Sequence, residues 1–102
     1  MKNEGISMTN FANPGEFTAY SEQAYEAAYR RYALMHNLSQ VLMRLRDDID
    51  SPIPENCFQA ELTEIARADL EMRAALAQAN GAAALCGKPP LRLSDLTRSR
   101  KA

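Results

Sequence analysis

The chain has 102 residues, of which 46% are hydrophobic and 25% are charged. This composition is that of one ordinary globular domain and excludes a disordered chain. No stretch approaches the roughly 18 consecutive apolar residues that span a membrane, and no signal peptide opens the sequence. We therefore expect a cytoplasmic, non-membrane protein in which Cys57 and Cys86 are free thiols.

Residues 1–12 are polar and aperiodic, and they predict a flexible arm. Asn13 followed by Pro14 is typical of a helix start. From Phe17 to Ile49 there is neither Gly nor Pro, and the apolar residues recur at heptad spacing, which predicts one long amphipathic helix. One track of this repeat holds Ala28, Met35, Leu42 and Ile49, and the other holds Phe17, Ala24, Leu38 and Leu45.

A second helix is predicted over about residues 55–80. Pro52 and Pro54 end the first helix, and Pro54 also suits the first position of the next one. Asn80 and Gly81 predict the end of the second helix. Its apolar seam consists of Phe58, Leu62, Ile65, Met72, Leu76 and Ala79.

Two long helices with a short connection predict an all-α fold, a long antiparallel helical hairpin. If Ile49 lies opposite Phe58, the two apolar patterns match along their length, and Met35 lies opposite Met72.

Arg31 and Asp69 interrupt this seam. We expect both at its edge, with Asp69 paired to Arg73, because a buried charge is costly unless it is paired. The alternative is a buried ion pair or a ligand contact inside a larger bundle.

The last part of the chain is basic, and it gives residues 88–102 a net charge of +4 against −5 for residues 1–87. Pro89 and Pro90 predict an extended strut that Leu91 and Leu93 attach to the hairpin, and Ser94 with Asp95 predicts a short last helix. The predicted organisation is an arm (1–12), a hairpin domain (13–87) and this basic segment (88–102). Its candidate polyanion-binding residues are Lys88, Arg92, Arg98, Arg100 and Lys101.

Residues that carry chemistry are sparse. His36 is the only histidine and has no second ligand beside it, so no metal site is expected. Asp47, Asp48 and Asp50 lack the glycine and glutamate of a calcium loop and predict a solvated acidic corner, with docking of a basic partner surface as the alternative. No phosphate loop, serine elbow or dinucleotide motif occurs, so we expect neither a cofactor nor an enzyme.

Tyr25, Tyr29, Tyr32 and His36 follow spacings of four, three and four, and therefore share one face of the first helix. Tyrosine is favoured at the centre of protein interfaces because it offers a large rigid ring with a polar tip. The face is thus a candidate partner-binding site. Equally, the rings could cover the core beneath the C-terminal segment.

These features favour a small non-catalytic protein that binds and modulates a larger protein partner as an adaptor or inhibitor. Self-association is also expected, because a hairpin buries only one stripe of each helix. The alternatives are a nucleic-acid-binding regulator that uses the basic tail, and an oligomer that sequesters a small anionic ligand at Arg31. In length, helical make-up and lack of catalytic motifs the chain resembles many accessory proteins of phages and mobile elements, which often modulate a host enzyme or complex.

Overall fold

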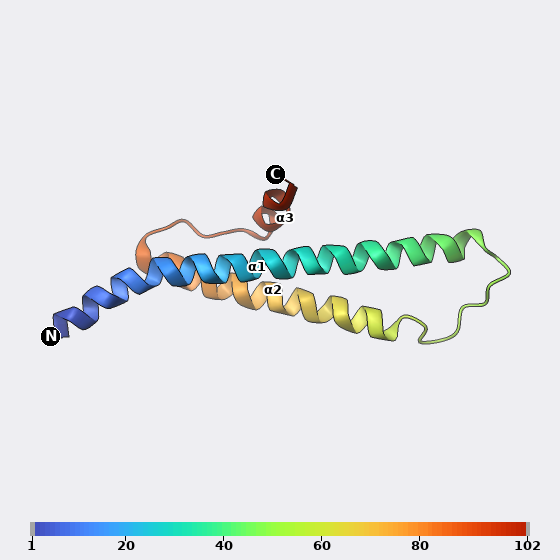
Figure 1. Ribbon diagram of the computed structural model, residues 1–102, viewed down its shortest axis with the longest axis horizontal. Coiled ribbons are helices and arrows are strands. Elements are labelled where there is room, and N and C mark those ends of the chain that lie inside the picture. Colours follow the sequence, from blue (N-terminus) through green and yellow to red (C-terminus); the bar gives the residue numbers. More distant parts are fainter. Residues whose placement is uncertain (1, 102) are drawn as a thin grey trace.

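The computed structural model describes the backbone of residues 2–101 and the side chains of residues 15–97. This part of the chain contains three helices, α1 (Lys2–Asp47), α2 (Gln59–Cys86) and α3 (Leu93–Lys101), and no strand. Helices α1 and α2 pack against each other as a hairpin, and the segment after α2 turns back so that α3 lies against α1 (Figure 1). The predicted all-α hairpin with a short third helix is confirmed.

The molecule is elongated. Its principal extents are 72 × 27 × 13 Å, and its radius of gyration is 19.3 Å, against about 13 Å for a compact domain of this length. The accessible surface is 7430 Å², whereas a compact monomer of 11.4 kDa exposes about 5,800 Å². The hairpin therefore leaves exposed a large area that a compact domain would bury.

Helix α1 begins at Lys2, so the predicted helix start at Asn13 was wrong. A proline inside a helix removes one backbone donor and crowds the carbonyl four residues earlier, at a cost of about 3 kcal/mol. That cost does not end the helix when the residues on both sides of the proline are helical. The flank before Pro14 contains no other proline and a single glycine, Gly5.

Helix α2 begins later than predicted, at Gln59. Asn56 adopts a left-handed backbone conformation with φ of 63°, which an α-helix of L-residues does not accommodate. The residues before Gln59 therefore form turns, and Pro54 is not the first helical residue.

The same helix also ends later than predicted, at Cys86 instead of Asn80. Gly81 lies inside it and costs about 1 kcal/mol relative to alanine, but the adjacent Ala82 and Ala83 are buried, and this packing stabilises the helix. Gly87, with φ of 76°, ends it, and the N–H of Lys88 donates to the Ala83 carbonyl over 2.9 Å.

The buried core consists mostly of alanine. Small side chains at these positions allow the helix axes to approach closely, but each contributes little apolar area. The largest fully buried side chain is Leu96 of α3, which packs with Met72 and three alanines of α1. The buried alanines are Ala24, Ala27, Ala28, Ala68, Ala75, Ala79, Ala82 and Ala83.

The register of the hairpin differs from the prediction. The predicted match placed Leu38 opposite Asp69, whereas the structure pairs Arg31 with Asp69 and Arg30 with Glu71. The shift is one heptad, because Arg31 precedes Leu38 by seven residues. A heptad pattern matches itself again after such a shift, so it cannot select one register alone. The pairing of Ile49 with Phe58 is therefore not formed.

Candidate functional site

Near the loop, the hairpin leaves large apolar side chains exposed. The heptad track that starts with the buried Ala28 continues towards the loop with exposed residues. In Figure 1, α1 and α2 diverge towards the loop, and α3 lies over the other half of the hairpin. We call the exposed residues the loop-end apolar patch: Met35 (44% exposed), Leu42 (45%), Ile49 (92%) and Leu62 (54%).

An aromatic row runs along the surface of α1. The ring centroids of Tyr29 and Tyr32 are 6.4 Å apart, and those of Tyr32 and His36 are 6.1 Å apart with an interplanar angle of 20°. All three side chains are exposed, whereas Tyr25 is half-buried and packs against the core cluster. Of the four predicted partner-binding residues, three therefore form the exposed aromatic row and one supports the core.

The Arg31–Asp69 pair joins α1 and α2 at the boundary between the alanine core and the loop half of the hairpin. Arg31 Nε and Arg73 Nε each lie 2.9 Å from a different oxygen of Asp69. The two atoms that join Arg31 to Asp69 are shielded from solvent, although both side chains are partly exposed. The hydrogen bond from Arg73, aided by the charges of Arg73 and Arg31, lowers the pKa of the Asp69 carboxyl against the opposing effect of desolvation. The expected Asp69–Arg73 pair is confirmed, and Asp69 also binds Arg31.

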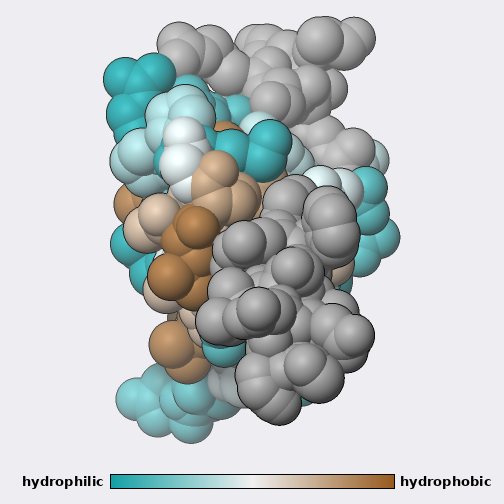
Figure 2. Space-filling model, turned by 90° about the vertical axis from the view of Figure 1, so that its left-hand side faces the viewer, coloured by the Kyte–Doolittle hydropathy of each residue, from teal (hydrophilic) through white to brown (hydrophobic). Residues whose placement is uncertain are grey.

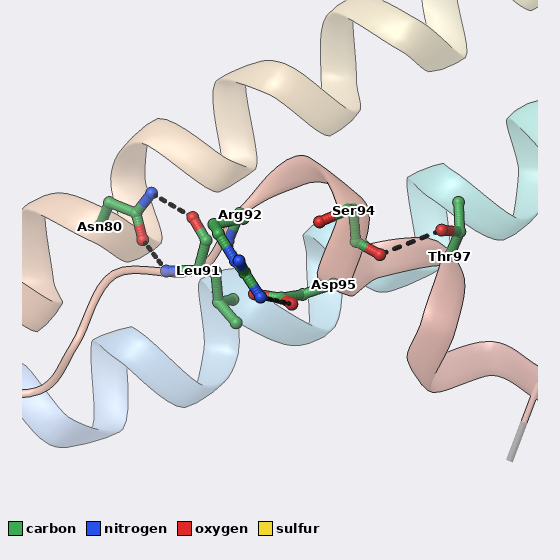
Figure 3. A network of polar contacts seen from close by, with 6 residues as sticks. All are labelled: Asn80, Leu91, Arg92, Ser94, Asp95 and Thr97. Atoms are coloured by element: carbon green, nitrogen blue, oxygen red, sulfur yellow. Dashed lines mark hydrogen bonds and ion pairs between the residues drawn. The ribbon is translucent and has the colours of Figure 1, made fainter.

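The C-terminal segment is fastened by a polar clip (Figure 3). The side chain of Asn80 donates to the Leu91 carbonyl over 3.0 Å and accepts from the Leu91 N–H over 2.8 Å. Asn80 was predicted to end the helix. It lies inside α2 instead, and its side chain holds the extended segment before α3. Asp95 accepts from the backbone N–H of Arg92 over 2.9 Å, which caps the start of α3.

The attachment of α3 was only partly predicted. Leu91 is half-buried, but Leu93 is exposed, and Leu96 is the residue that enters the core. The available signal was the three-residue spacing of Leu93 and Leu96 in a short helix, which does not reveal which of the two faces inward.

The basic residues of the C-terminal segment are partly engaged within the chain. Lys88 Nζ lies 5.6 Å from the centroid of the Phe17 ring, a cation–π contact, and Arg92 lies 3.2 Å from Asp95. The side chains of Arg98, Arg100 and Lys101 lie outside the described residues. The structure therefore brings two of the five candidate polyanion-binding residues onto partners in the same chain.

Further surface features are less distinctive. Between α1 and α2, an open depression of about 370 Å³ is lined mainly by polar side chains and by the Arg30–Glu71 pair. At the end where α2 stops, Figure 2 shows hydrophobic side chains, and Leu85 in the last turn of α2 is exposed. Cys57 and Cys86 are free thiols. Within the described residues, no group of three or more His, Cys, Asp or Glu side chains is placed to hold a metal ion.

No protein-family model, curated protein or solved structure matches this chain. Among the helices described above, none is long and apolar enough to cross a membrane.

Proposed function

We propose that this chain is a non-catalytic protein-binding module that acts as an adaptor or inhibitor of a larger protein. In this proposal the aromatic row of Tyr29, Tyr32 and His36 is the contact surface. A helical face with rings one turn apart is a common way for a helix to dock into a groove of another protein.

The single observation that carries the proposal is the exposure of the row on a continuous helix. Tyr29 and Tyr32 are exposed and do not belong to the core cluster of alanines, Met72 and Leu96, so their rings are not needed to complete that core. Rings held on a helix lose little conformational entropy when they are buried by a partner. Tyrosine at such positions is a frequent hot spot.

The test compares two variants as baits. Tyr29→Ala/Tyr32→Ala removes both rings, and Leu70→Ala removes a smaller exposed apolar side chain from α2 as the control. A nuclease-treated lysate at moderate salt is passed over wild type and both variants. The proposal expects one protein that wild type and the control retain in stoichiometric amount and that the double variant loses.

Binding of that protein is then measured with purified components. Each hot-spot tyrosine is expected to contribute at least about tenfold in Kd, which corresponds to roughly 1.4 kcal/mol. If the double variant keeps the helix content of wild type by circular dichroism and binds equally well, the aromatic row is not the contact surface. Capture of nucleic-acid-linked proteins alone, lost on nuclease treatment, would favour the basic tail instead.

A further inference from the structure

We infer that the loop-end apolar patch binds a second copy of this chain, in an antiparallel overlap of the two loop halves. The patch consists of residues other than those of the aromatic row. Three features carry the inference: the area left open, the lack of charge across the patch, and the charges at its two ends.

The chain as a whole exposes more area than a stable dimer needs to bury. The chain exposes roughly 1,600 Å² more than a compact monomer of its mass. A standard interface covers about 800 Å² on each partner. Met35, Leu42, Ile49 and Leu62 are 44–92% exposed in the single hairpin, so a partner that covered them would bury part of this excess.

The segment of α1 under the patch is free of charge. From Tyr32 to Met43 the sequence has no Asp, Glu, Lys or Arg. Depletion of charge is the compositional mark of the buried centre of an interface. A solvated helix face of this length would normally carry charged residues.

The two ends of the patch differ in net charge. Residues 47–66 include the loop and hold six acids and no basic residue, whereas Arg44 and Arg46 precede them and Arg46 Nε lies 2.9 Å from Asp47. On the other side of the patch, Arg30 and Arg31 lie at the level of Glu71 and Asp69, to which they are paired. The acidic residues are Asp47, Asp48, Asp50, Glu55, Glu61 and Glu64, and the arginines of the opposite band are Arg30, Arg31, Arg67 and Arg73.

This arrangement selects the antiparallel orientation. A two-fold rotation across the hairpin places the acidic loop of one copy beside the arginine band of the other, and does so twice. Parallel copies would place acid beside acid and arginine beside arginine, which is unfavourable. The overlap would form a four-helix bundle over the loop halves and leave the α3-covered halves at its two ends.

The first test is the mass of the full chain across a concentration series, measured by analytical ultracentrifugation. Wild type should shift from one chain mass to two as its concentration rises. Leu42→Lys, at an exposed patch position, should raise the dissociation constant at least about tenfold. Leu85→Lys, at an exposed position in the last turn of α2 far from the patch, should leave it unchanged. A wild-type chain that stays monomeric at every concentration, or equal effects of both lysines, would overturn the inference.

A charge exchange then tests the orientation. Asp50→Lys/Glu55→Lys and Arg67→Glu should each weaken the dimer at least about tenfold, because each creates like charges across the interface. Combining all three changes in one chain should restore it. In a parallel dimer neither set of changes would weaken association, so that outcome contradicts the proposed overlap. Circular dichroism of each variant checks that the helices remain formed.

Because the aromatic row is not altered in any of these variants, failure of the dimer leaves the proposed function standing. Conversely, Tyr29→Ala/Tyr32→Ala should retain the wild-type dissociation constant of the dimer. The two surfaces can therefore be judged separately.

Discussion

The two halves of the hairpin share one heptad pattern but differ in what covers them. In the half near α3, alanines bring α1 and α2 together, and Leu96 closes the cluster. In the loop half the helices diverge, and larger residues such as Leu42 and Leu62 remain exposed. The comparison teaches that large apolar residues do not by themselves make a core. A third element must cover them, since two helices alone bury only one stripe each.

The largest expected effect comes from removing that cover. Leu96→Ala should destabilise the fold by about 3 kcal/mol, because it empties a fully buried site that the neighbouring alanines cannot fill. Thermal unfolding followed by circular dichroism should show a midpoint lower by roughly 10 °C or more. The control is Leu70→Ala, which removes an exposed leucine and should change stability by no more than about 0.5 kcal/mol. Equal losses in the two variants would contradict the role given to α3.

A smaller effect is expected from opening the polar clip. Asn80→Ala removes both hydrogen bonds to Leu91 and should cost about 1–2 kcal/mol. Hydrogen exchange of the Leu91 amide should then become about tenfold faster, since that amide loses its acceptor. Asn80→Asp keeps the acceptor and should show a smaller change at neutral pH. An exchange rate unaltered by Asn80→Ala would show that the strut is held by its apolar contacts alone.

The smallest effect belongs to Asp69, at the boundary between the halves. Its pKa is lower in the folded chain than in the unfolded one, chiefly because Arg73 donates a hydrogen bond to the ionised carboxylate. The resulting stabilisation is therefore present above the unfolded pKa of about 3.9 and is lost as the pH falls through the lower folded value.

Denaturant unfolding of wild type and Asp69→Asn at several pH values measures this contribution. The stability difference between them should shrink as the pH falls from about 5 towards 2, because the wild-type carboxylate becomes protonated. Asp95→Asn is a useful comparison, since its effect would be confined to the start of α3. A difference that does not change with pH would mean that the ionisation of Asp69 does not contribute.

The sequence patterns predicted the general fold, but they predicted less well which residues contact each other. The 3.6-residue periodicity and the two prolines before Glu55 indicated two long helices and a turn, because these signals are local. They also placed Tyr29, Tyr32 and His36 on one face. Whether that face, or the basic tail, contacts another molecule remains a prediction.

By itself, the sequence determined that the chain is helical, that it folds back between Ile49 and Glu55, and that one helix face carries a row of rings. Only the tertiary structure decided the register, the passage of α2 through Gly81, and the choice of Leu96 over Leu93 as the anchor of α3. The physical reason is that helix formation follows from neighbouring residues, whereas a heptad repeat fits equally well after a shift of seven. The register and the attachment of the C-terminal segment are then selected by contacts between residues distant in sequence, such as Arg31 with Asp69 and Asn80 with Leu91.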